Sequence, residues 1–195
     1  MNAEPKNAET RVLTGTVRFS YAHLFTPHKS AEGADPKYSV TLLIDKKDAV
    51  TVERIKTAIK AAEASGIAST WQGKKPASYK YPVVRDGDEE KPDSEGYAGM
   101  WFINASCKSK PGVVDANVQP IIDPGELKSG DYGRVTLNFY AYNQAGNKGI
   151  GCGLINVQKK ADGPALGTRT SPEDDFAEDM GDVPATGPVK NPWDL

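Results

Sequence analysis

The strict alternation of side chains over residues 131–142 restricts the fold of this chain more than any other feature. Val135, Leu137 and Phe139 are separated there by polar residues. Successive side chains of a β-strand point to opposite faces of the sheet, so this pattern predicts a strand with one buried face and one open face. A chain built on such a strand needs a sheet that covers a core.

Weaker versions of the same pattern recur and predict a set of short strands. One segment differs, because residues 48–65 repeat apolar side chains at helical spacing, with Asp48 as a cap and Gly66 as a stop. Short strands around one helix predict a small, mainly β barrel with Greek-key-like strand order. The expected strands cover residues 11–19, 37–44, 100–108, 113–114, 118–122, 131–142 and 150–157.

The composition agrees with strands and turns. The 195 residues are 38% hydrophobic, with 19 glycines and 14 prolines, which fits one domain, or at most two small ones. Gly149, Gly151 and Gly153 alternate along the last expected strand and permit tight bending or the close approach of another backbone. No apolar run has membrane-spanning length and the N-terminus lacks a signal-peptide core, so we expect a soluble, intracellular protein with no membrane contact.

The cysteines and histidines give no sign of a metal or cofactor. Cys107 and Cys152 each lie in an apolar stretch, which favours two small buried side chains, with a disulfide left open. His23 and His28 are the only histidines and show no zinc-ligand spacing. We therefore expect no metal and no cofactor.

The charge of the chain is divided unevenly. Residues 173–195 hold seven acids and one lysine, a net charge of −6, whereas the preceding 172 residues carry +4. Such a tail has too little apolar surface to order itself, and it can lie against the basic body or be offered to other proteins. The expected organisation is a flexible arm (1–10), one domain (11–160), and a linker with an acidic tail (161–195). The tail residues expected to bind partners are Asp174, Asp175, Phe176, Glu178, Asp179 and Trp193.

The segment 71–81 interleaves three aromatic residues with three lysines. Cations for the phosphates and rings for the bases are what a groove for single-stranded DNA needs. The alternative is that the rings anchor the loop to the body while the lysines are solvated. One of Trp71, Tyr79 and Tyr81 is expected to be such an anchor.

The outward faces of strands 100–108 and 131–142 carry rings among polar side chains. Tyr140 and Tyr142 favour stacking on bases, while Phe102 fits stacking and burial under the long, weakly regular loop of residues 68–99 equally well. The candidate DNA-binding residues are Arg18, Tyr21, Lys37, Trp71, Lys74, Lys75, Tyr79, Lys80, Phe102, Lys108, Arg134, Tyr140, Tyr142 and Lys148.

A catalytic function has little support. Asp86, Asp88, Glu89 and Glu90 resemble Mg²⁺ ligands, but two-metal sites need carboxylates that converge from separate elements, so a solvated turn fits better. No nucleophile–base arrangement occurs, and the glycine-rich stretch 146–153 lacks the P-loop pattern. We expect a protein without catalytic residues.

Six phrases stand out in the chain: Phe19-Ser-Tyr-Ala-His-Leu-Phe, Lys37-Tyr-Ser-Val-Thr-Leu-Leu-Ile, Arg85-Asp-Gly-Asp, Gly133-Arg-Val-Thr-Leu-Asn-Phe-Tyr-Ala-Tyr-Asn, Asn147-Lys-Gly-Ile and Glu173-Asp-Asp-Phe. In this order they resemble a family of tailed-phage single-stranded DNA-binding proteins over residues 12–176. The resemblance implies an OB-fold that binds single strands without sequence preference in phage replication or recombination, in the host cytoplasm. It also implies an acidic tail that competes with DNA and contacts replication partners. The last four residues differ from the acidic-Pro-Phe ending of the best-known bacterial tails.

Two other functions remain open at this point. A recombination factor that anneals complementary strands would bind single strands first. A protein-interaction or virion-assembly module would use the same barrel without nucleic acid.

Overall fold

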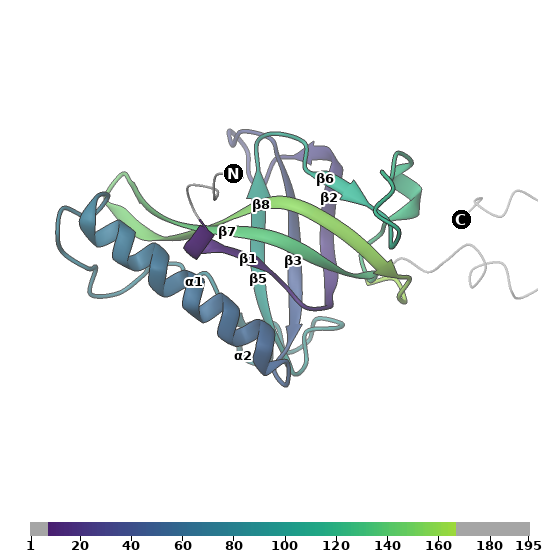
Figure 1. The fold of residues 1–195 in the computed structure, drawn as a ribbon, viewed down its shortest axis with the longest axis horizontal. Coiled ribbons are helices and arrows are strands. Elements are labelled where there is room, and N and C mark those ends of the chain that lie inside the picture. Colours follow the sequence, from purple (N-terminus) through teal and green to yellow (C-terminus); the bar gives the residue numbers. More distant parts are fainter. Residues whose placement is uncertain (1–7, 167–195) are drawn as a thin grey trace, which may run out of the picture.

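A computed structural model of the protein describes residues 8–166 (Figure 1). The residues expected to recruit partners lie outside this range. They are Asp174, Asp175, Phe176, Glu178, Asp179 and Trp193.

In the described part of the chain, five long strands close into a barrel. They are β2 (Val17–His28), β3 (Lys37–Asp45), β5 (Met100–Cys107), β7 (Tyr132–Gln144) and β8 (Asn147–Ala161). The order around the barrel is β7-β2-β3-β5-β8, and β8 pairs again with β7. All neighbours are antiparallel except β5 and β8, which run parallel. This closed Greek-key order confirms the expected OB-like barrel.

Shorter elements decorate the barrel. β1 pairs with β7, β4 with β5, and β6 with β8. These elements are η1 (Ala8–Thr10), β1 (Arg11–Leu13), β4 (Arg85–Asp86), α2 (Gly87–Glu90), β6 (Gly112–Val114) and η2 (Pro124–Glu126).

The strand expected over residues 11–19 is interrupted and forms two strands, β1 and β2. Thr14 breaks it, because its hydroxyl accepts a hydrogen bond from the backbone N–H of Val135 at 3.0 Å. Gly15 then donates its N–H to the hydroxyl of Thr51 at 2.9 Å. β2 also continues to His28, further than expected, because irregular pairing keeps it on β3.

The expected helix is α1 (Ala49–Ala68), which lies along the curved β7–β8 pair (Figure 1). Asp48 caps it as expected, accepting a hydrogen bond from the N–H of Thr51. Gly66 is not the stop, because the helix continues past it. A side chain at Gly66 would collide with Ala141 and the ring of Trp71, so this glycine permits close packing.

The barrel interior is the core. Val135, Leu137 and Phe139 are at most 1% exposed, as their alternation predicted. A second, smaller cluster lies outside the barrel, where Leu43, Tyr97 and Phe102 pack with the half-buried Leu166. This cluster joins the last described residue of the chain to the long loop between α1 and β5.

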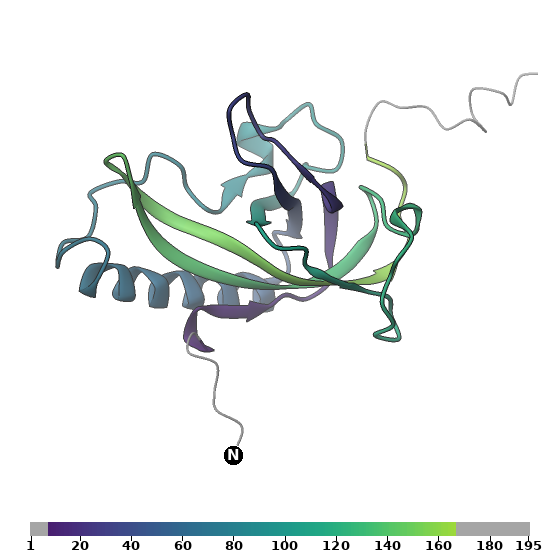
Figure 2. The same cartoon turned by 90° about the horizontal axis from the view of Figure 1, so that it is seen from above.

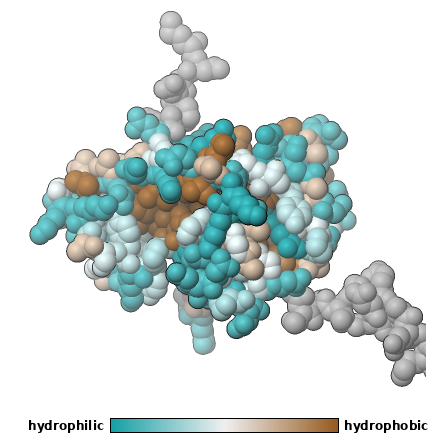
Figure 3. All heavy atoms as spheres, turned by 90° about the horizontal axis from the view of Figure 1, so that it is seen from below, coloured by the Kyte–Doolittle hydropathy of each residue, from teal (hydrophilic) through white to brown (hydrophobic). Residues whose placement is uncertain are grey.

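Apolar side chains also reach the surface on the underside of the molecule, where they gather in a hollow framed by hydrophilic ones (Figure 3). Beside α1 a hollow of about 570 Å³ is lined by Val52, Ile55, Val84 and Trp101, among others. Within residues 8–166, no helix is long and apolar enough to span a membrane.

The two cysteines are both free. Cys152 is buried and Cys107 is half-buried, and burial raises the pKa of both thiols. They therefore act as small apolar side chains rather than as reactive groups.

Candidate nucleic-acid interface

Two hollows of about 420 and 540 Å³ adjoin on the outer face of β3 and β5. Both are lined by Arg85, Asn104 and Ser106, so they form one depression across β5, which we call the groove. The β2–β3 hairpin contributes to one end and the β7–β8 pair to the other (Figure 2). The aromatic and basic residues that line the groove are Tyr21, His28, Lys37, Lys80, Tyr81, Arg85, Lys91, Tyr97, Phe102, Tyr140 and Tyr142.

Three tyrosines of the groove are unusually open. Tyr21, Tyr81 and Tyr140 are 58%, 60% and 47% exposed, while Tyr142 is half-buried. Rings this exposed have a free face, and each can carry a nucleobase by stacking. They lie at both ends of the groove, so a strand that crosses it meets a ring at either side.

Glycines of β8 place two of these rings. Gly151 and Gly149 lie opposite Tyr140 and Tyr142 in the β7–β8 register. A Cβ at 151 would lie 2.6 Å from Cζ of Tyr140, and one at 149 would lie 2.6 Å from the hydroxyl of Tyr142. The rings therefore lie across the backbone of β8. The close approach expected at these glycines occurs, but a ring makes it instead of a backbone.

Cations flank the rings. The Lys80 ammonium lies 5.3 Å from the ring centre of Tyr81. The Arg85 guanidinium lies 4.7 Å from the ring centre of Phe102, and its Nε donates to Glu90 at 2.8 Å. The hydrogen bond with Glu90 raises the pKa of Arg85. With Lys37 and Lys91, these groups give the groove positive charge for a phosphate backbone.

Phe102 does not offer a free ring. It lies on the outer face of β5 as its alternation predicted, but it is only 2% exposed. The ring of Tyr97 packs edge-on against it, with 5.3 Å between the ring centres, and the Arg85 guanidinium lies over its face. Of its two open interpretations, the structure shows burial under the long loop, which leaves no face of the ring open to a base.

The segment after α1 is anchored by two of its rings. Trp71 is 1% exposed and donates its Nε1–H to the carbonyl of Tyr142 at 3.0 Å. The ring centre of Tyr79 lies 5.9 Å from that of Trp71, and its hydroxyl donates a hydrogen bond to Glu63 at 2.7 Å. Trp71 therefore supports the strand that carries Tyr142, and the anchor expected in this segment is found in Trp71 and Tyr79. The buried ring of Trp71 has no face open to a base.

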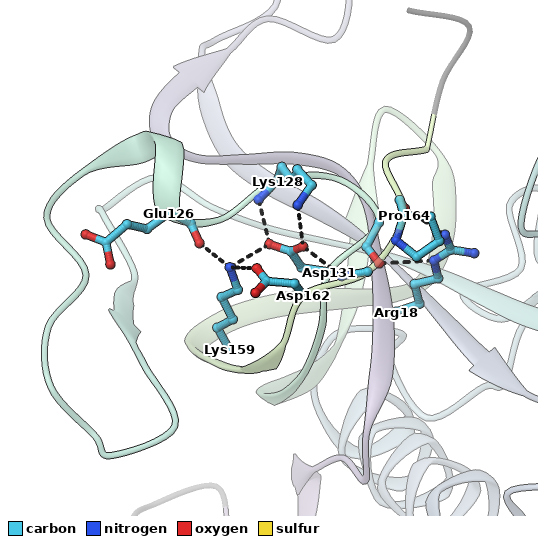
Figure 4. A network of polar contacts seen from close by, with 9 residues as sticks. Arg18, Glu126, Lys128, Asp131, Lys159, Asp162 and Pro164 are labelled. Atoms are coloured by element: carbon cyan, nitrogen blue, oxygen red, sulfur yellow. Dashed lines mark hydrogen bonds and ion pairs between the residues drawn. The ribbon is translucent and has the colours of Figure 1, made fainter. Parts of the chain in front are cut away.

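Arg18 holds the segment after β8 in place and does not line the groove. It donates to the carbonyls of Gly130 and Pro164 at 3.1 and 2.8 Å (Figure 4). Its guanidinium also lies over the ring of Tyr132. Its place in this contact network makes it a structural residue.

Arg134 likewise supports a loop. Its Nε donates to Gln158 at 2.6 Å, and Gln158 donates onward to the carbonyls of Asp115 and Ala116. The arginine is exposed as expected but lies outside the groove lining.

The other candidate lysines are split between the groove and its surroundings. Lys37 and Lys80 line it. Lys75 is paired with Glu63 at 2.8 Å, and Lys108 lies 3.8 Å from Asp35, a residue of the groove margin. Lys74 and Lys148 are not part of the lining, although Lys148 lies near the tip of the β7–β8 pair.

The acidic turn at 86–90 is occupied by internal ion pairs. Lys46 lies 2.5 Å from Asp86 and 2.7 Å from Asp88, and Glu90 pairs with Arg85. Hydrogen bonds from these cations lower the pKa values of all three acids. In the described residues no group of three potential ligands converges on a metal position.

Tyr81, Arg85, Lys91 and Asn104 line the groove but were not among the sequence candidates. The first three lie in the long loop between α1 and β5, whose irregular sequence pattern does not reveal which side chains face the groove. The available signal was Arg85-Asp-Gly-Asp, one of the six phrases that carry the family resemblance. In the structure its first two residues form β4 against β5. Asn104 shares the outward face of its strand with Phe102, but an exposed asparagine has no sequence pattern that separates a ligand contact from an ordinary surface residue.

Comparisons with known proteins identify the relatives of this chain. The family described as Enterobacter phage Enc34, ssDNA-binding protein, matches residues 10–184. Protein p50 of Acyrthosiphon pisum secondary endosymbiont phage 1 is 35% identical over 167 residues, which cover 80% of this chain and 86% of that protein.

Solved structures show the same barrel. The single-stranded DNA-binding protein from bacteriophage Enc34 in complex with ssDNA is 27% identical, with a TM-score of 0.70 over 81% of this chain and 90% of that one. The gp2.5 single-stranded DNA-binding protein of bacteriophage T7 shares the fold, with 18% identity and a TM-score of 0.58 over 93% and 98% of the two chains. The resemblance drawn from the six phrases is confirmed, and the chain belongs to the Enc34 family of phage single-stranded DNA-binding proteins.

Proposed function

We propose that this protein binds single-stranded DNA in the groove, without strict sequence preference, during phage replication and recombination in the host cytoplasm. The observation that carries the proposal is the set of three exposed tyrosines among cations on one face of an OB-like barrel. The Enc34 relative bound to ssDNA supports the same ligand.

The position of the groove fits this ligand. OB-folds bind oligonucleotides on the face of their second and third strands and with the loops that join strands one to two and four to five. Counted along the barrel, these are β3, β5, the β2–β3 hairpin and the β7–β8 turn. The groove occupies this face, and Tyr21, Tyr81 and Tyr140 stand around it.

Two kinds of contact would hold the strand. Stacking on a tyrosine contributes about 1–3 kcal/mol per base and tolerates any base, because every base has a π-face. Lys37, Lys80, Arg85 and Lys91 would hold phosphates, and their contribution would fall as salt rises.

A titration tests the proposal. A labelled mixed-sequence single strand should bind at low salt, more tightly than the matching duplex, and graded lengths should give the number of nucleotides per protein. Fluorescence anisotropy measures both. Absence of binding to the single strand at low salt would contradict the proposal.

The acidic tail is proposed to compete with DNA and to recruit replication or recombination proteins. Leu166, the last described residue, packs with Tyr97 and Phe102, two residues of the groove. Leu166 therefore lies beside the groove, and residues 173–195, which follow it in the sequence, carry a net charge of −6.

Removing residues 173–195 should tighten DNA binding several-fold at low salt and make it more salt-dependent. In the full chain, salt weakens both the DNA contacts and the competing tail contacts to the lysines, so the two effects partly cancel. Without the tail, salt weakens only the DNA contacts. Anisotropy titrations of both chains at several salt concentrations measure this. A shortened chain with unchanged affinity would exclude tail competition, and a pull-down with the tail peptide would test recruitment separately.

A further inference from the structure

The middle of the groove has a polar floor. Arg85, Asn104 and Ser106 line both hollows and so lie where the two join. Asn104 is exposed on β5, directly opposite the buried Thr41 of β3. The floor thus presents polar groups between the tyrosines at the two ends.

Thr41 orients the Asn104 amide. Its hydroxyl donates to Oδ1 of Asn104 at 2.8 Å, and Thr41 is only 7% exposed. This hydrogen bond uses one of the two lone pairs of the amide oxygen and holds that oxygen toward β3. Among the described residues Nδ2 makes no hydrogen bond, so its two N–H donors are available to a ligand in the groove.

Arg85, which lines the same junction as Asn104, adds further hydrogen-bond donors. Arg85 can only donate, and its contacts to Glu90 use Nε and one terminal nitrogen. The remaining guanidinium donors lie at the same junction of the groove. Ser106 can either donate or accept. Asn104 and Arg85, the two side chains held by hydrogen bonds at the junction of the two hollows, therefore present mainly donors to the groove.

We infer that this donor set makes the central position of the groove prefer a base whose major-groove edge carries a keto oxygen, which is O4 of uracil or thymine and O6 of guanine, over cytosine or adenine, which carry an amino group at that place. Thymine presents O4 and guanine presents O6 as acceptors, whereas cytosine and adenine present an amino group there. An amino group facing Nδ2 of Asn104 leaves donors unpaired, which costs binding free energy. The inference rests on the proposed function and adds the base chemistry of one nucleotide position.

This preference is compatible with broad sequence tolerance. The tyrosines stack on any base, so a single hydrogen-bonding position changes affinity only modestly. We expect a ratio of about two- to tenfold between preferred and disfavoured bases, the effect of one hydrogen bond.

Oligo(dU) and oligo(dC) of equal length provide the test. The two bases differ in the keto or amino group at position 4 and the associated proton at N3, and they stack similarly. The full-length protein should bind oligo(dU) about two- to tenfold more tightly at neutral pH, by anisotropy at one fixed salt concentration.

Variants of the floor identify the responsible group. Asn104→Asp replaces the donors with an acceptor, so the ratio should shift in favour of oligo(dC) while both affinities fall. Asn104→Ala and Thr41→Val should bring the ratio close to one, the second by releasing the amide. Ser106→Ala is the matched control and should leave the ratio unchanged, because a hydroxyl serves either base.

The outcomes separate the two proposals. Equal binding of oligo(dU) and oligo(dC), or the wild-type ratio retained in Asn104→Asp, overturns the base preference and leaves the DNA-binding function intact. Failure of both oligonucleotides to bind overturns the DNA-binding function itself. Circular dichroism of each variant verifies that the fold is kept.

Discussion

Replacing Asp131 with asparagine is expected to destabilise the fold by about 3 kcal/mol, because the change removes a buried carboxylate that pairs with two lysines and accepts backbone N–H groups. Asp131 is fully buried, and its carboxylate lies 3.2 and 3.0 Å from the ammonium groups of Lys128 and Lys159 (Figure 4). It also accepts the N–H groups of Lys128 and Gly163. The NH₂ group of an asparagine amide at this position would face the lysine ammonium groups and the backbone N–H groups, which are also donors. Urea unfolding followed by circular dichroism measures the loss.

Asp162→Asn is the matched control. Asp162 contacts the same Lys159 ammonium at 2.7 Å, but its side chain is 80% exposed. An exposed pair contributes at most about 1 kcal/mol, so this variant should be nearly as stable as the wild type. Similar losses in both variants would contradict the central place of Asp131.

The same carboxylate predicts acid sensitivity. Burial alone raises the pKa of Asp131, but hydrogen bonds from Lys128, Lys159 and Gly163 outweigh it, so the pKa in the folded state is lowered. A lowered folded pKa gives stability that is present above the unfolded value of about 3.9 and lost as pH falls through the folded value. The stability difference between wild type and Asp131→Asn should therefore shrink below about pH 4. A difference independent of pH would rule out this linkage.

Replacing Tyr140 with alanine should weaken DNA binding by about 1–3 kcal/mol, or roughly five- to 150-fold in Kd. The loss should persist at high salt, because stacking is screened less than phosphate contacts. Lys80→Ala should instead lose most of its effect as salt rises. Anisotropy titrations at low and high salt compare the two.

Two further variants show that the ring and its placement are responsible. Tyr140→Phe keeps the ring and should bind nearly as well as the wild type. Gly151→Val keeps Tyr140 but puts a side chain where the ring lies, so it should reproduce much of the alanine loss. Equal salt dependence of Tyr140→Ala and Lys80→Ala would show that the ring does not stack on a base.

Local periodicity was enough to predict much of the fold. The alternation of Val135, Leu137 and Phe139 identified a strand that the structure buries on that face. Asp48 identified the start of α1. Such signals depend on neighbours within a few residues, so the sequence carries them directly.

The candidate site was predicted only in part. Tyr21, Lys37, Lys80, Tyr140 and Tyr142 line the groove, and the residue types of a stacking and phosphate-binding surface were visible in the sequence. Whether an individual ring is open or buried was not, because that depends on what another segment places over it.

What the sequence by itself determined about this protein is its class: a strand-rich barrel with one helix, a basic body and an acidic C-terminal segment, with rings and cations on outward faces. Only the tertiary structure decided which rings are free. Phe102 and Tyr140 both point outward from their strands, but the long loop brings Tyr97 over Phe102, while Gly151 leaves Tyr140 lying open on β8. The physical reason is that a side chain's direction is set by its own strand, whereas its exposure is set by contacts between residues far apart in the chain.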